Sequence, residues 1–182
     1  MSRQLLVATS AMILCAAFGL AAAAQEATMP KPGPEHQALG FFAGKWSFEG
    51  EAKESPLGPA GKITFTETCE WFEGGFALVC RSEGMTPMGP SSSVAISSYD
   101  AGQKAYTYYA VEANMPPFMA TGQREGKVWS YSTESEMGDM SVTTRVIITE
   151  TSSTTYTFEM EVSTDGSTWT PVIEGTSTKS SS

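Results

Sequence analysis

From Gly44 onward, apolar and polar residues alternate with a period of two, which is the pattern of β-strands that bury one face. The clearest examples lie near the C-terminus, where Val146 and Ile148, and then Phe158 and Met160, alternate with polar residues. Thr, Val, Tyr and Trp are frequent in these segments, as is typical of pleated, half-buried strands. The pattern predicts about ten strands, over residues 45–52, 62–72, 76–83, 93–99, 104–112, 118–124, 127–134, 140–149, 155–162 and 168–176.

Turn sequences separate these segments, and the chain offers no helix that could connect parallel strands. The turns are Gly74-Gly75, Asp100-Ala101-Gly102, Glu125-Gly126 and Asp165-Gly166. A long meander hides its edges by closing on itself. We therefore predict an all-β fold, an antiparallel up-and-down barrel of about ten strands. A short N-terminal helical turn is expected at 35–42, where apolar residues have helical spacing. A two-sheet sandwich is the alternative.

The N-terminus has the three parts of an export signal. Arg3 provides the positive charge, residues 5–20 the apolar stretch, and Ala22 to Ala24 the small residues before a cleavage site. An uncleaved N-terminal anchor is the alternative. The expected localisation is periplasmic or secreted. We predict a signal peptide at 1–24, a flexible leader at 25–34, the barrel domain at 35–179 and a disordered tail at 180–182.

The chain is acidic, with a formal net charge of -9 from 11 basic and 20 acidic residues. Loss of residues 1–24 removes Arg3 and leaves 10 basic against 20 acidic residues, a net charge of -10. Such a surface repels phosphates, so no nucleic-acid partner is expected. No second apolar stretch is long enough to span a membrane as a helix, and no integral membrane insertion is expected after cleavage. These features leave the oligomeric state open.

Two cysteines, Cys69 and Cys80, remain after cleavage, in an oxidising compartment. A hairpin centred on Gly74-Gly75 places them directly opposite each other on the inward face, so a structural disulfide is expected. A two-residue turn would make them a hydrogen-bonded pair. A four-residue loop with the same register would make them a non-hydrogen-bonded pair. Two buried free thiols are the alternative.

Methionines occur in pairs where the long, Pro-rich connections of the meander fall at one end of the predicted barrel. Barrel mouths are common sites for small molecules, and flexible thioether side chains suit a portal for an apolar ligand. A hydrophobic plug is the alternative, and a Cu(I) site is a weaker one because no Cys or His accompanies the methionines. The predicted portal consists of Met85, Met88, Met115, Met119, Met137 and Met140.

Four apolar residues are the candidates for lining the cavity or the core: Phe65, Trp71, Leu78 and Trp129. The alternation puts Phe65, Cys69 and Trp71 on one strand face. It does not decide whether Trp129 or Val128 points inward.

The sequence contains no catalytic constellation. His36 is the only histidine, and its place in the helical turn favours a capping or surface role. No histidine is left for a Ser-His-Asp triad, a His-based zinc site or a haem ligand within the strands. We predict no catalytic residues, no metal site and no cofactor. Glu159 and Glu161 alternate with apolar residues and are expected to be solvated, and an enzyme that uses carboxylates is a less favoured alternative.

A resemblance to a known family rests on an ordered set of short motifs between Pro34 and Lys179. They are Pro34-Glu35-His36-Gln37, Leu39, Gly44-Lys45-Trp46, Glu49-Gly50, Thr66-Glu67-Thr68 and Gly74-Gly75. This set resembles an uncharacterised bacterial domain family that opens with P-E-H-x-x-L…G-x-W. The family implies no established activity.

The Gly44-Lys45-Trp46 segment is also similar to the opening strand of lipocalins and fatty-acid-binding proteins, which are calycin-type barrels. The tryptophan of those proteins closes the narrow end of the barrel, which implies a structural role for Trp46. Related haem-binding nitrobindin-like barrels use a histidine late in the chain, and this chain has none there. Our leading hypothesis is an exported, lipocalin-like barrel that binds a small apolar or amphipathic ligand. A packed barrel that acts as a protein-interaction or structural module is the alternative.

Overall fold

The computed structural model describes residues 30–55, 58–113, 115–138 and 140–180. The predicted signal peptide, the first half of the leader and the last two residues lie outside this part of the chain. The elements, in chain order, are α1 (Pro34–Ala38), the 3₁₀ turn η1 (Leu39–Phe41), β1 (Gly44–Ala52), β2 (Gly61–Trp71), β3 (Ala77–Thr86), β4 (Gly89–Asp100), β5 (Ala105–Glu112), β6 (Met115–Glu125), β7 (Val128–Met137), β8 (Met140–Glu150), β9 (Thr155–Ser163) and β10 (Thr170–Lys179).

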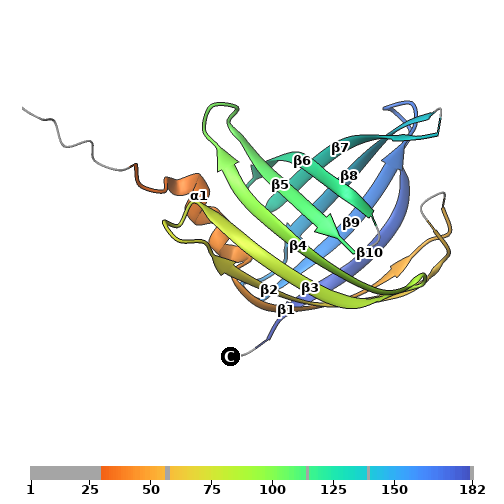
Figure 1. Cartoon of the computed structure of the whole chain (residues 1–182), viewed down its shortest axis with the longest axis horizontal. Coiled ribbons are helices and arrows are strands. Elements are labelled where there is room, and N and C mark those ends of the chain that lie inside the picture. The colour runs from red at the N-terminus through yellow and green to blue at the C-terminus, as the bar shows by residue number, and fades with distance from the viewer. Residues whose placement is uncertain (1–29, 56–57, 114, 139, 181–182) are drawn as a thin grey trace, which may run out of the picture. The chain divides into compact units, whose positions relative to one another are not determined.

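The ten strands form a closed antiparallel barrel in which each strand pairs with its neighbours in sequence, and β1 pairs with β10 (Figure 1). The closing pair runs from Trp46 opposite Lys179 to Ala52 opposite Ile173. The predicted up-and-down barrel with a short N-terminal helical segment is therefore confirmed. Closure satisfies the backbone groups that an open meander would leave at its edges.

The β3–β4 and β5–β6 connections, at the end of the barrel away from α1, are shorter than the sequence suggested. The expected loop after residue 83 is mostly strand, because β3 and β4 continue to a turn at Pro87 and Met88. β6 likewise begins at Met115. The pairing of β5 and β6 shifts register between Ala110 and Glu112, opposite Pro116-Pro117. Proline cannot donate to a sheet ladder, and a bulge accommodates it within the strand.

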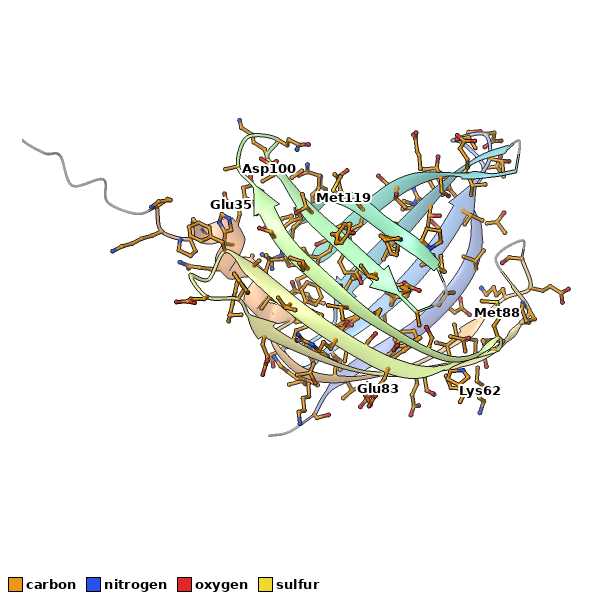
Figure 2. All side chains as sticks on the ribbon, viewed as in Figure 1. Glu35, Lys62, Glu83, Met88, Asp100 and Met119 are labelled. Carbon is orange, nitrogen blue, oxygen red and sulfur yellow. A yellow bond between two sulfur atoms is a disulfide. The ribbon has the colours of Figure 1, made fainter. Side chains whose placement is uncertain are left out.

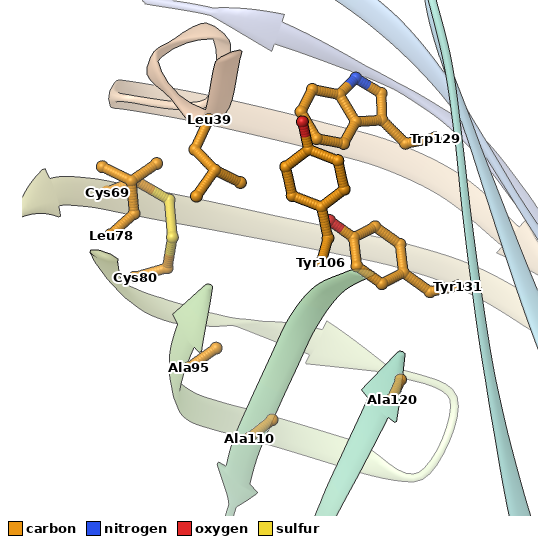
Figure 3. Packing of buried hydrophobic residues seen from close by; sticks show 10 residues of the cluster. All are labelled: Leu39, Cys69, Leu78, Cys80, Ala95, Tyr106, Ala110, Ala120, Trp129 and Tyr131. Carbon is orange, nitrogen blue, oxygen red and sulfur yellow. A yellow bond between two sulfur atoms is a disulfide. The ribbon is translucent and has the colours of Figure 1, made fainter. Parts of the chain in front are cut away.

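α1 and η1 cover one end of the barrel, where the side chains of several strands meet. Leu39 of η1 is fully buried. The backbone N–H of Gly33 donates to Nδ1 of His36 at 3.3 Å, and the His36 ring contacts Phe76 and Tyr99 edge-on. The predicted capping role of His36 is thus confirmed. The buried cluster beneath these turns contains Leu39, Cys69, Leu78, Cys80, Ala95, Tyr106, Ala110, Ala120, Trp129 and Tyr131 (Figure 3).

Packing is uneven along the barrel axis. Inward residues near α1 are buried, whereas several inward residues farther from it are only half-buried. Ile63, Val142 and Val172 are buried exceptions. The half-buried apolar residues include Phe48, Phe65, Phe158 and Met160. Within the described residues, no helix combines the length and apolar character needed to cross a membrane.

Candidate functional site

The disulfide fixes one wall of the barrel interior. Cys69 on β2 pairs directly with Cys80 on β3, and their Sγ atoms are bonded. The hairpin between them ends in a four-residue loop, because the N–H of Phe72 donates to the carbonyl of Ala77 at 2.8 Å. Hydrogen-bonded and non-hydrogen-bonded pairs alternate along an antiparallel hairpin, so Cys69 and Cys80 form a non-hydrogen-bonded pair. Their Cα separation of 4.0 Å agrees with this. Both cysteines are buried.

Aromatic rings lie flat against glycines on the inside of the wall. A Cβ built on Gly175 would lie 2.4 Å from the Phe48 ring, and one on Gly84 would lie 2.5 Å from the Phe65 ring. Gly122 receives the ring of Tyr131 in the same way, at 2.5 Å. A ring that covers a glycine on the neighbouring strand packs along the wall and does not project toward the barrel axis.

Glu67 points into this interior, since it alternates on β2 with Phe65 and Cys69. One of its carboxylate oxygens and the two disulfide Sγ atoms all lie within 4.8 Å of one another. Those sulfur atoms are bonded to each other, so they offer no thiolates to a metal ion. Burial raises the pKa of Glu67 from 4.5 to about 7.

Tyrosines from other strands converge on the same region. The charge of Glu67 contributes to raising the pKa of Tyr108 on β5 and of Tyr156 on β9, after the larger effect of burial, and the pKa of Tyr156 reaches about 12. Glu112 on β5 also acts on Tyr108, and burial raises the pKa of Glu112 itself. Polar groups from three different strands thus meet inside the barrel.

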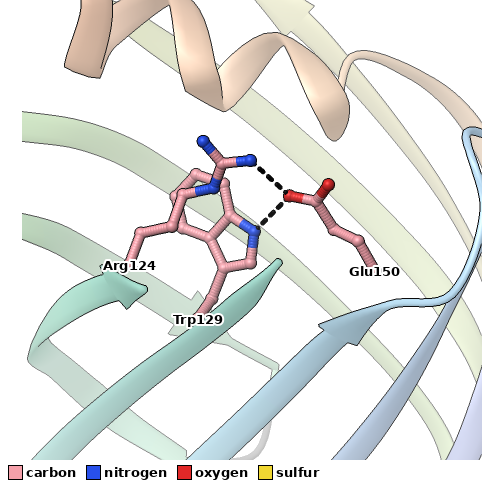
Figure 4. A network of polar contacts seen from close by, with 3 residues as sticks. All are labelled: Arg124, Trp129 and Glu150. Carbon is pink, nitrogen blue, oxygen red and sulfur yellow. Dashed lines mark hydrogen bonds and ion pairs between the residues drawn. The ribbon is translucent and has the colours of Figure 1, made fainter. Parts of the chain in front are cut away.

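A polar network lies at the end covered by α1 (Figure 4). One carboxylate oxygen of Glu150 accepts a hydrogen bond from Trp129 Nε1 at 2.7 Å and from Arg124 at 3.0 Å. The Arg124 guanidinium lies 4.8 Å from the Trp129 ring centroid. This network satisfies the buried indole N–H and orients a tryptophan that packs beneath η1.

Trp46 lies at the same end of the barrel. Its Nε1 donates to the carbonyl of Phe42 at 2.7 Å, and its ring contacts Phe41 and Tyr156. The Lys179 ammonium lies 5.1 Å from the ring centroid. Trp46 therefore joins the first and last strands to the covering turn.

A family model described as "Protein of unknown function (DUF1579)" matches residues 31–179, which include the N-terminal turns and all ten strands. The chain belongs to this family. The predicted membership of a family without known activity is therefore confirmed. A search of the curated proteins finds no match to this DUF1579 chain.

Among solved structures, the DUF1579 chain is similar to the one titled "Crystal Structure of Rv2717c from M. tuberculosis". The two share 11% sequence identity with a TM-score of 0.56, over 82% of this chain and 99% of the other. At this identity the likeness shows the fold alone.

The predicted methionine portal is not assembled as expected in this DUF1579 member. Met119 pairs with Tyr109 on the outer wall and is 59% exposed. Met85 is likewise exposed within β3, and Met88 lies in the β3–β4 turn, distant from Met119 (Figure 2). Met115 is exposed at the start of β6. The sequence placed Met85, Met88 and Met115 in loops, but β3 and β6 extend through Met85 and Met115. Met119 lies in a strand as predicted, on its outward face.

Met137 and Met140 pair with each other at the β7–β8 turn. Their side chains lie outside the described part of the structure.

The four predicted cavity or core residues have different positions. Leu78 and Trp129 are fully buried, which settles that Trp129 and not Val128 points inward. Phe65 is half-buried inside the barrel. Trp71 is the exception: it is 40% exposed because it ends β2 at the rim, where its ring edge lies near Gly40.

The inward acidic residues were not among the predicted site residues. The signal was present for Glu67, because the period of two places it between Phe65 and Cys69. For Glu161, in contrast, the expectation of a solvated side chain overstated its exposure. Glu161 forms an ion pair with Arg145 and is only 17% exposed, and Arg145 stacks on Trp169 at 3.9 Å.

The outside of the wall is also hollowed. A concavity of about 700 Å³ crosses β1 to β5, and a second of about 580 Å³ adjoins it. Their linings overlap at Thr66, Glu83, Ser92 and Ala113. These residues face outward, since they alternate with inward neighbours such as Phe65 and Gly84. Both concavities are open to solvent, and neither encloses a ligand site of the kind that buries most of a small molecule.

Proposed function

We propose that this protein is an exported barrel that binds a small amphipathic molecule in its interior, between the end away from α1 and the buried cluster beneath α1 and η1. The observation that carries the proposal is the partial exposure of Phe48, Phe65, Phe158 and Met160, although these side chains face inward. Solvent that reaches inward apolar side chains indicates unfilled interior space. A ligand that displaced this solvent would gain about 25 cal/mol per Å² of apolar surface that it buries.

The chemistry of the interior supports the same proposal. An apolar wall with a few convergent polar groups is typical of small-molecule sites. Here the apolar wall consists of rings packed on glycines, and Glu67, Tyr108 and Tyr156 are the convergent groups. Export is supported by the features of residues 1–24 and by the Cys69–Cys80 disulfide, which oxidising compartments maintain.

The test compares two adjacent serines of β4 in a titration with the neutral, apolar fluorophore N-phenyl-1-naphthylamine. Ser93 faces inward and Ser92 outward. Saturable binding to the wild type is expected, with at least a tenfold loss for Ser93→Trp because the indole fills the interior. Ser92→Trp is expected to bind normally. Absence of saturable binding to the wild type, or equal loss in both variants, would contradict the proposal. Urea unfolding confirms that both variants are folded.

A second candidate function is self-association through the outer face of β4 to β6. Exposed apolar side chains are neighbours there across three strands: Ile96 pairs with Tyr109, which pairs with Met119, and Val94 pairs with Val111. Soluble monomers rarely expose contiguous apolar patches of this kind.

Charge complementarity favours a second copy as the partner of this face. Arg81 on β3 and Glu134 on β7 flank it, each exposed and two strands from β5. A two-fold axis along β5 would bring Arg81 of each copy toward Glu134 of the other. Light scattering after size exclusion should show a dimer that Tyr109→Glu converts to a monomer. A monomeric wild type would rule this candidate out.

A further inference from the structure

A stripe of polar side chains crosses the inside of the wall from β2 to β5. Glu67 pairs with Ser82, Ser82 with Ser93, and Ser93 with Glu112. The hydroxyl oxygens of Ser82 and Ser93 lie 2.7 Å apart and share a hydrogen bond. We call these four residues the polar stripe. A carboxylate stands at each end of it, and both carboxylates act on Tyr108.

Neither carboxylate of the polar stripe has a cationic partner in the described part of the chain. Among the described residues, Glu67 and Glu112 form no hydrogen bond or ion pair through their side chains. The two inward cations there, Arg124 and Lys179, are engaged at the end covered by α1. Arg124 pairs with Glu150, and Lys179 donates to the carbonyl of Phe41 while it lies over Trp46.

A buried carboxylate without a partner is costly when it is ionised. The raised pKa values of Glu67 and Glu112, both caused by burial, express this cost. The groups that face Glu67 are Trp46 from β1, Ser82 from β3, Tyr108 from β5 and Tyr156 from β9. None of them is a cation. Aromatic faces add to the affinity for a positive charge.

We propose that the barrel interior recognises a positively charged amphipathic molecule, an alkylammonium compound, whose ammonium group pairs with Glu67 of the polar stripe. Its apolar chain lies against the rings of Phe48 and Phe65. The ammonium group supplies the charge that the interior lacks, and the serine hydroxyls accept its remaining hydrogens. This inference rests on the proposed function, since it assigns the ligand class of the same interior.

Isothermal titration calorimetry with dodecylammonium chloride and dodecanol tests the inference. The two probes share a chain length and differ in the charge of the head group. At pH 8, dodecylammonium is expected to bind the wild type at least tenfold more tightly than dodecanol. Glu67→Gln should remove that preference and leave the affinity for dodecanol unchanged, which also shows that the variant is folded. Glu70→Gln is the matched control, because Glu70 lies on the same strand and is exposed on the opposite face.

The pH dependence provides an independent readout. Lowering the pH from 8 to 6 protonates Glu67, whose pKa is about 7, while an alkylammonium stays charged because its pKa is near that of lysine, about 10.4. The affinity for dodecylammonium should therefore fall at least threefold and that for dodecanol should not change. Equal binding of both probes would overturn the inference and leave the proposed function standing. A preference for dodecylammonium that survives in Glu67→Gln would overturn the role of Glu67. Binding of neither probe would overturn both proposals.

Discussion

Cys69 and Cys80 face each other across β2 and β3 at a non-hydrogen-bonded pair, with their Cα atoms 4.0 Å apart. The four-residue loop between β2 and β3 determines which pairs of the hairpin are hydrogen-bonded, since the N–H of Phe72 donates a hydrogen bond to the carbonyl of Ala77 at its base. The disulfide therefore joins two strands that already pair, beside the inward carboxylate of Glu67. It stiffens the wall that carries the polar stripe.

The first prediction concerns the contribution of this disulfide to stability. Reduction, or the double change Cys69→Ala and Cys80→Ala, should lower the free energy of unfolding by about 2–3 kcal/mol, the loop-closure value for so short a loop. Urea unfolding with and without dithiothreitol measures it. The double variant serves as the control, because it should not respond to the reductant. A wild type equally stable in both conditions would contradict the prediction.

The second prediction concerns Glu67 and pH. Its pKa is higher in the folded protein, about 7, than the ordinary value of 4.5. The folded state therefore binds the proton more tightly, and stability is lost as the pH rises between these two values. The free energy of unfolding of Glu67→Gln should exceed that of the wild type by about 3 kcal/mol at pH 8 and by almost nothing at pH 4.

Urea unfolding of the ligand-free protein at the two pH values measures this difference. Glu70→Gln, on the exposed face of the same strand, should show no comparable gain at pH 8. A Glu67→Gln advantage that is equal at pH 4 and pH 8 would show that the charge of Glu67 is not its cause.

The third prediction concerns the network at the covered end. Glu150→Ala leaves the indole N–H of Trp129 and the guanidinium of Arg124 without their shared acceptor. A loss of about 2–3 kcal/mol in the free energy of unfolding is expected, because hydrogen bonds to a charged group are involved and Glu150 is only 11% exposed. The matched control is Glu174→Ala. Its ion pair with Lys53 is largely exposed, so the change should stay below about 1 kcal/mol. Similar losses in both variants would contradict the prediction.

The fourth prediction concerns the rings that cover glycines. In Gly175→Ala the new methyl group would lie 2.4 Å from the Phe48 ring and 2.5 Å from the carbonyl oxygen of Glu49. The ring and backbone must shift, at a cost of about 1–3 kcal/mol. Gly40→Ala meets only the Trp71 ring edge at 3.5 Å, an ordinary contact, and should be tolerated. Thermal unfolding compares the two, and an equal effect would show that the covering rings do not constrain the wall.

The sequence by itself determined the all-β barrel, the pairing of Cys69 with Cys80 and the existence of the helical turn around His36. These features follow from local rules: the period of two, the turn residues and the constant register of a hairpin. Hairpin register also placed Trp71 opposite Leu78, as observed. It could not show that Trp71, the last residue of β2, lies at the rim and stays exposed.

Only the tertiary structure decided which groups meet inside the barrel. Glu67, Tyr108 and Tyr156 come from β2, β5 and β9, which are far apart in sequence, and closure of the sheet brings them together. The extension of β6 to Met115 has a related cause: β5 and β6 pair through part of the segment that the sequence indicated as a loop. Strand length depends on pairing between strands, and a pattern read along one strand does not contain that information.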